Sequence, residues 1–144
     1  FWNHHRGCPE FAGERWSAHD PKASPKLAVA AKYGLRLVEG RMASGFSTDP
    51  ACIHYGMNSG FQAINLAMLF GATRIVMVGF DMHGPRGASH FFGDHPNRTP
   101  PPFPFFMPAF NQPATMLPPG VAIVNATPGS ALTCFPMARL EDAL

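Results

Sequence analysis

Apolar segments alternate with glycine, proline and polar residues along the chain, and this pattern predicts several short elements. The segment SPKLAVAAKYG predicts a helix with Ser24 as its N-cap and Gly34 just past its end. Leu35 to Val38 and the segment CIHY each predict a short strand. The first third of the chain therefore predicts one helix followed by two strands.

The clearest pattern is the run NSGFQAINLAMLFGATRIVMVGFD. Ser59 followed by Gln62 has the form of a capping box, which predicts Ser59 as the N-cap of a helix. Residues 61–70 are apolar on nearly every side, as in a helix buried between layers, and Gly71 closes this helix. The segment RIVMV then predicts a strand buried on both faces of a parallel sheet.

The C-terminal part begins with nine prolines between Pro96 and Pro119. This density predicts an extended, proline-rich excursion without a regular helix, packed through its phenylalanines. VAIVNAT predicts a third strong strand, and FPMARLEDAL predicts a short helix that begins near Pro136. The alternation of helices and strands predicts a single α/β domain over residues 1–144, a three-layer Rossmann-like parallel sheet with helices on both faces.

Composition limits the classes of function. The chain has 144 residues, of which 46% are hydrophobic and 14% charged, and this argues against disorder. No apolar run reaches the length of a membrane span. The net charge is +2 with scattered basic residues, so there is no electrostatic footprint for nucleic acid. Three widely spaced cysteines without a CxxC pair do not predict disulfides, and a reducing cytoplasm is the simplest setting.

Ligands of open parallel sheets bind beyond the carboxyl ends of the strands, and two short motifs fall there. In NSG, Asn58, Ser59 and Gly60 begin a helix whose free N–H groups can hold a phosphate, unless Ser59 is only a cap. In GFDM, Gly79 and Asp81 follow a strand. That carboxylate either binds a metal, a ribose hydroxyl or a pterin-like donor, or caps the following turn.

The loop GFDMHGPRGASHFFGDHP concentrates titratable groups. His90, Asp94 and His95, together with Asp81 and His83, either supply a general base near neutral pH or ligate a metal ion. Their spacing matches no HExxH or CxxC pattern. The alternative is that each histidine is solvated or hydrogen-bonded in place.

The turn in NATPGSAL contains Asn125 and Ser130 and follows the last strand. It either holds a second part of a nucleotide or is only a turn between a strand and a helix.

The run NSGFQAINLAMLFGATRIVMVGFDM resembles a segment shared by two related groups. These are the bacterial CMP-sialic-acid-dependent sialyltransferases and the MptE-like group, which includes a 6-hydroxymethyl-dihydropterin diphosphokinase. Together with GDHP and NATPGSAL, it is similar to phage and prophage proteins of this superfamily, over residues 54–144 with a gap in the proline-rich part. The resemblance implies a nucleotide-dependent transferase in the cytoplasm of a bacterial host.

The resemblance also implies roles for single residues. In the sialyltransferase pattern, Ser59 and Gly60 contact the nucleotide or nucleotide-sugar and Ser130 lies near it. His95 is the general base on the acceptor hydroxyl, with His90 as the alternative. The diphosphokinase pattern instead places Asp81 on Mg²⁺ and transfers a diphosphate from ATP.

The sequence departs from this pattern at two places. The GxGPS-type loop of the superfamily is not found, and FWNHH resembles the region after it. His83 and Gly84 stand where the sialyltransferases have tyrosines. The donor site is then either incomplete or completed by another chain, as in a homo-oligomer. Two other readings remain open: a binding or assembly protein that docks through its proline-rich arm, and a hydrolytic or structural metal site in the loop from Asp81 to His95.

Overall fold

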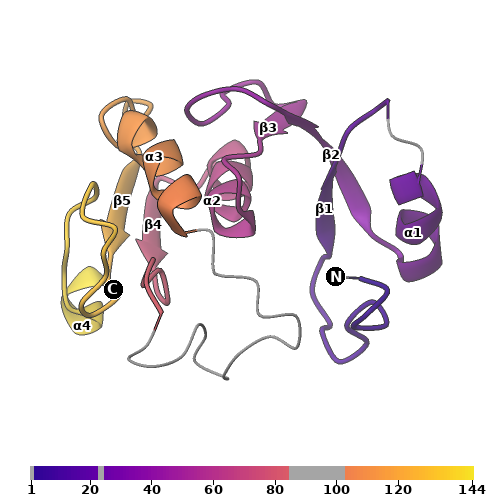
Figure 1. The fold of residues 1–144 in the computed structure, drawn as a ribbon, viewed down its shortest axis with the longest axis horizontal. Coiled ribbons are helices and arrows are strands. Elements are labelled where there is room, and N and C mark those ends of the chain that lie inside the picture. The colour runs from indigo at the N-terminus through magenta and orange to yellow at the C-terminus, as the bar shows by residue number, and fades with distance from the viewer. Residues whose placement is uncertain (1, 23–24, 85–102) are drawn as a thin grey trace.

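The computed structural model describes residues 2–22, 25–84 and 103–144, and Figure 1 shows their arrangement. The strands form two small parallel sheets, one with the order β1-β2-β3 and one with β4 beside β5. The elements are β1 (Trp16–His19), α1 (Pro25–Tyr33), β2 (Arg36–Arg41), β3 (Cys52–His54), α2 (Ser59–Leu69), β4 (Arg74–Met77), α3 (Phe103–Ala114), β5 (Ala122–Asn125) and α4 (Leu140–Ala143). The predicted α/β class with parallel strands is confirmed, but these strands do not join into one sheet.

Helix α2 lies between the two sheets (Figure 1). On one side it contacts β3, and on the other its Phe61 and Ile64 pack with Met77 of β4 and Ile123 of β5. The core is completed by Phe110 of α3, Leu132 and Phe135. The ring of Phe110 is fully buried and lies 5.3 Å from that of Phe61, so α3 closes the core over α2.

The two predicted helix ends are confirmed at their glycines, but the start of α2 differs from the prediction. Gly34 and Gly71 close α1 and α2 with φ of 61° and 88°, values that favour glycine. The N-cap of α2 is Asn58, whose side chain accepts a hydrogen bond from the N–H of Phe61 at 2.8 Å. The predicted capping box of Ser59 and Gln62 is therefore wrong, because asparagine already fills the cap one residue earlier.

Helix α3 contradicts the prediction that no regular helix forms in the proline-rich segment. Pro104 falls in its first turn, where an N–H has no acceptor in the helix. Pro108 and Pro113 lie inside the helix and each removes one hydrogen bond. An interior proline costs about 3 kcal/mol, and burial of Phe110 and Pro113 against the core acts in the opposite direction, with about 1.5–3 kcal/mol from the phenylalanine alone. Tertiary packing thus outweighs helix propensity here.

Strand β4 is shorter and less covered than predicted. It ends at Met77, and Val78 beyond it is 58% exposed. Ile75 and Val76 are half-buried rather than buried on both faces. The reason is that β4 has a neighbouring strand on one edge only, within the part of the chain that the structure describes.

The last helix begins at Leu140, not near Pro136. Residues 136–138 instead run alongside β5: the N–H of Asn125 donates to the carbonyl of Pro136, and the N–H of Ala138 donates to that of Asn125. This extended pairing delays the helix. At the other end of the chain, the pattern also missed β1, which pairs in parallel with β2 and is half-buried throughout.

Candidate functional site

The loop after β4 and the turn after β5 are hydrogen-bonded to each other. The N–H of Phe80 donates to the hydroxyl of Thr127 at 3.0 Å, and the hydroxyl of Ser130 donates to the carbonyl of Phe80 at 2.5 Å. The N–H of Ala131 donates to the carbonyl of Asp81 at 2.8 Å. The predicted motifs GFDM and NATPGSAL therefore lie side by side at the carboxyl ends of two parallel strands.

Asn125 and Ser130, both predicted to contact a nucleotide, are buried within this junction. The amide nitrogen of Asn125 donates to the hydroxyl of Ser130 at 2.9 Å and to the carbonyl of Leu132 at 3.0 Å. Its amide oxygen accepts from the N–H of Thr127 at 3.0 Å. The Ser130 hydroxyl also accepts from the N–H of Leu132. These side chains therefore hold the turn in shape, and the backbone and the exposed residues remain for a ligand.

The N-terminus of α2 meets the same loop. A Cβ built on Gly60 would lie 2.7 Å from a ring carbon of Phe80, so glycine is required for this close approach. Ser59 beside it is exposed, and Asn58 is half-buried. The predicted NSG motif thus joins GFDM and the turn after β5 in one cluster of loops.

Two backbone features mark these loops. Gly79 has a φ of 78° and turns the chain away from β4. Met57 and Met82, two of the four non-glycine residues with positive φ in the described part of the chain, lie in the loops after β3 and β4. Such conformations cost about 1–3 kcal/mol and concentrate at binding sites.

His83 links the loop after β4 to the turn after β5. Its Nδ1 lies 3.0 Å from the carbonyl oxygen of Gly84, and its Nε2 lies 3.1 Å from that of Gly129. Carbonyl oxygens only accept, so both contacts are hydrogen bonds when the imidazole is protonated. The carbonyl of Gly84 and then that of Gly129 raise the pKa of His83, and the nearby charge of Asp81 adds to this. Asp81 itself is exposed.

His90, Asp94 and His95 lie outside the described residues, as does the predicted N-cap Ser24. Of the predicted site residues, the structure brings Asn58, Ser59, Gly60, Gly79, Asp81, Asn125 and Ser130 into the same cluster of loops. No group of three or more metal-ligating side chains occurs among the residues that the structure describes.

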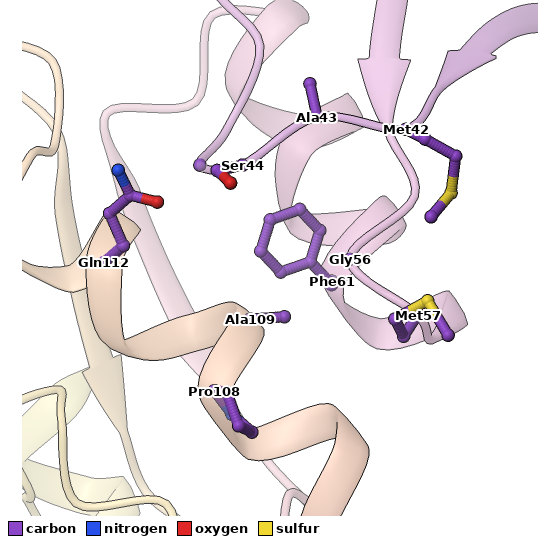
Figure 2. Close-up of a pocket in the computed structure, with 10 residues that line it drawn as sticks. Met42, Ala43, Ser44, Gly56, Met57, Phe61, Pro108, Ala109 and Gln112 are labelled. Atoms are coloured by element: carbon purple, nitrogen blue, oxygen red, sulfur yellow. The ribbon is translucent and has the colours of Figure 1, made fainter.

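Two cavities border α2. The smaller, of about 140 Å³, lies between residues 42–45, α2 and α3. Figure 2 shows the ring of Phe61 between the segment of residues 42–45 and Ala109 of α3. The larger, of about 530 Å³, lies between the first sheet and α2 and is bordered by Ser59. Only the larger falls in the range of small-molecule sites, which is about 300–1,000 Å³.

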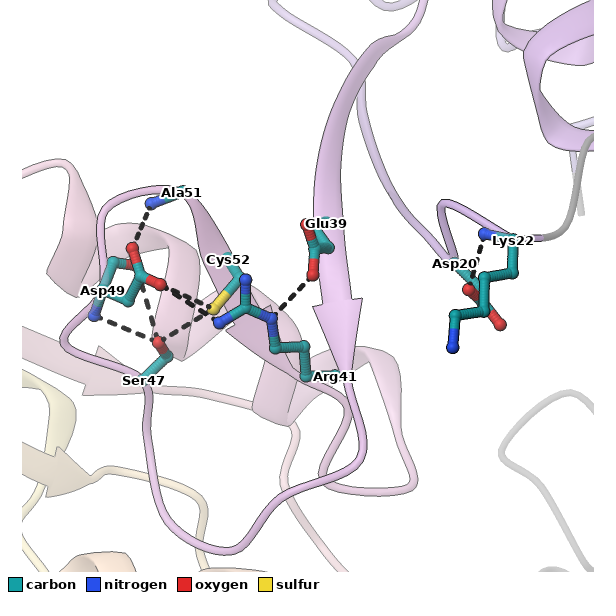
Figure 3. Close-up of polar contacts among 8 residues, drawn as sticks. All are labelled: Asp20, Lys22, Glu39, Arg41, Ser47, Asp49, Ala51 and Cys52. Atoms are coloured by element: carbon teal, nitrogen blue, oxygen red, sulfur yellow. Dashed lines mark hydrogen bonds and ion pairs between the residues drawn. The ribbon is translucent and has the colours of Figure 1, made fainter.

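A polar cluster that the sequence did not reveal folds the loop after β2 (Figure 3). Arg41 contacts Glu39 at 2.6 Å and Asp49 at 3.1 Å. The N–H of Ala51 holds the pKa of Asp49 below its usual value. The buried thiol of Cys52 donates to the same carboxylate at 3.6 Å. Because this thiol is covered, the cluster is suited to holding the loop rather than to nucleophilic chemistry.

Asn65 was also missed, although an asparagine in an apolar helix is itself a signal. It is fully buried, its amide oxygen accepts from the N–H groups of Ser47 and His54, and its amide nitrogen donates to the carbonyl of Ser47. It thus ties the loop after β2 to β3.

The fold and the loops define a mixed α/β protein with parallel strands and a cluster of loops at their carboxyl ends. Comparisons with protein families, with curated proteins and with solved structures give no match to this chain. The resemblance to the sialyltransferase and MptE-like groups therefore stays a prediction. No helix in the described ranges has both the length and the apolar character that a membrane crossing requires.

Proposed function

We propose that this protein is a nucleotide-dependent transferase with a Rossmann-like fold, of the sialyltransferase-like or MptE-like kind. The observation that carries the proposal is the meeting of three loops around Phe80: the start of α2, the loop after β4 and the turn after β5. Parallel α/β proteins bind nucleotides at this kind of edge.

The start of α2 provides the site for the phosphate groups. Asn58 satisfies the N–H of Phe61, whereas the N–H groups of Ser59 and Gly60 have no acceptor among the described residues. These two donors and the positive end of the helix dipole favour an anion. The exposed position of Ser59 leaves room for it.

The loop after β4 supplies charged groups next to the phosphate site. Mg²⁺ in nucleotide sites is held by one or two carboxylates together with phosphate oxygens, and the exposed Asp81 fits as one such ligand. Bound there, the ion would neutralise charge on the leaving phosphate. His83 adds a positive charge when protonated.

The general base belongs to the continuation of this loop, with His95 as the first candidate and His90 as the second. In a glycosyl transfer, the acceptor oxygen attacks the anomeric carbon of the donor while the bond to the phosphate oxygen breaks. The nucleotide leaves with the bonding electron pair, and the histidine takes the acceptor proton.

Thermal stability with CMP, CDP, ATP and UDP-sugars, each with and without Mg²⁺, tests the binding step. The variant Ser59→Pro removes the N–H of the first helical residue, a position that accepts proline, and Asn58 before it is already extended. Ser59→Ala removes only the hydroxyl and serves as the control. We expect a nucleotide to raise the melting temperature of the wild type and of Ser59→Ala. In Ser59→Pro its affinity should fall about tenfold or more, because one hydrogen bond to a charged group is lost.

A folded wild-type protein that responds to none of these nucleotides would contradict the proposal and favour a binding module. The catalytic step is tested separately with His95→Ala and His90→Ala. Transfer should be lost in the first variant while nucleotide binding stays, and unchanged turnover in both would remove histidine from the base role.

A further inference from the structure

The cavity of about 530 Å³ between the first sheet and α2 has the composition of a site for a flat ring. Its floor is apolar and is formed by Val38 and Ile53 of the sheet and Leu66 of α2. Trp2 and Trp16 line it as well, and they are the only two tryptophans in the chain. Apolar walls with aromatic side chains are typical of sites for planar organic ligands.

Trp16 is held in place before any ligand arrives. Its indole N–H donates to Glu14 at 3.1 Å, and the guanidinium of Arg36 lies 5.6 Å from its ring centroid. The ring of Phe70 meets it edge-on, with the centroids 5.2 Å apart. A fixed aromatic ring can stack on a ligand without a large loss of conformational entropy.

The charges around the cavity limit what the ring can be. Glu14 is the one charged side chain among the described residues that line it, and its carboxylate also pairs with Arg36 at 2.8 Å. Gln62 and Ser17 add neutral polar groups. The guanidinium of Arg36 offsets the charge of Glu14, but the carboxylate still accepts hydrogen bonds, so the cavity favours a neutral ring that carries N–H donors.

We propose that this cavity binds a neutral, planar heteroaromatic ring with N–H donors, of the size of a nucleobase. Only the identification of this ring as the base of the bound nucleotide rests on the proposed function. Ser59 borders the cavity and also begins α2, so a base in the cavity lies next to the phosphate site.

Tryptophan fluorescence reports directly on this cavity, because both tryptophans line it. Adenosine, guanosine, cytidine and uridine carry no phosphate and test the ring alone, with N-acetyltryptophanamide correcting for their absorbance. We expect saturable quenching by at least one nucleoside. No saturable quenching by any of them would overturn the proposal.

A pair of substitutions separates the cavity from non-specific effects. Ala63→Leu fills the cavity from an exposed position on α2, whereas Ala31→Leu adds the same side chain to an exposed position on α1. We expect the first to weaken nucleoside binding about tenfold or more, as a clash in a packed site does, and the second to leave it unchanged. Equal effects of the two variants would overturn the proposal. Circular dichroism melts verify that both variants fold. Trp16→Phe gives a second test, with Trp2 as the fluorescent reporter, and nucleoside binding should also weaken in this variant.

The failure of this inference differs from that of the proposed function. Nucleoside quenching that persists in Ser59→Pro while the nucleotide response is lost supports both. A nucleotide response in the wild type without nucleoside quenching, and unaffected by Ala63→Leu, overturns the ring site but leaves the phosphate site standing.

Discussion

The replacement Asn125→Ala tests how the turn after β5 is held against the loop after β4. The side chain of Asn125 is fully buried and makes three hydrogen bonds, to Ser130, Leu132 and Thr127. Alanine makes none of them. The Ser130 hydroxyl keeps its bonds to Phe80 and to the N–H of Leu132.

Two buried backbone groups lose a partner in this variant: the carbonyl of Leu132, and the N–H of Thr127. Each unsatisfied buried group costs about 1–3 kcal/mol, so the free energy of unfolding should fall by about 2–6 kcal/mol. Domains of this size are stable by about 5–15 kcal/mol, which makes this a large share of the total. Asn125→Asp keeps the shape but buries a carboxylate and sets one of its oxygens against the Leu132 carbonyl, which only accepts, so it should be at least as unstable.

Urea unfolding followed by circular dichroism gives the change in free energy. Asn58→Ala is the matched control, because it removes one half-buried asparagine whose oxygen caps α2, a loss of about 1 kcal/mol. If Asn125→Ala cost no more than Asn58→Ala, the argument that the turn depends on this buried amide would be refuted.

Three further changes test other parts of the structure. The pKa of His83 is raised in the folded protein, so this residue stabilises the fold fully below its unfolded pKa of about 6.5. The stabilisation is lost as the pH rises through the folded pKa. The free energy of unfolding in urea should therefore differ less between about pH 5 and pH 8 in His83→Asn than in the wild type. Gly60→Ala places a Cβ 2.7 Å from the ring of Phe80 and should cost about 1–3 kcal/mol in the same assay, with a weaker response to nucleotide. Pro108→Ala restores a helical N–H at an exposed position of α3 and should stabilise by up to about 3 kcal/mol, seen as a higher melting temperature; a lower one would contradict the helix.

Local patterns predicted the elements that local interactions determine. Helix α1 and the end of α2 follow from proline and glycine positions, which act through the backbone of single residues. Helix α3 and the pairing of residues 136–138 with β5 were predicted wrongly, because both depend on contacts with distant segments. Phe110 can favour a helix only where Phe61 and Phe135 are already in place.

The candidate site likewise has features that local patterns predict and features that depend on distant contacts. Reasoning from strand ends placed Asp81 and Ser130 together, since β4 and β5 share an edge, whereas Gly60 joins them from the other sheet through its close approach to Phe80. It did not reveal that Asn125 and Ser130 use their polar atoms on each other. Nor did it find the cavity beside Trp16, because no local pattern links residues from three strands and a helix.

The buried amide of Asn125 has a consequence for how a ligand could be recognised at this edge. A fully buried side chain that already makes three hydrogen bonds inside the protein cannot also bind a nucleotide without breaking the turn. Recognition at the carboxyl edge must then come from groups that the junction leaves available: the N–H groups of Ser59 and Gly60, and the exposed carboxylate of Asp81. These groups lie on segments held in place by Asn58 and by the Phe80–Thr127 contact. The buried network therefore acts by fixing positions, and substitutions within it should lower stability before they alter ligand specificity.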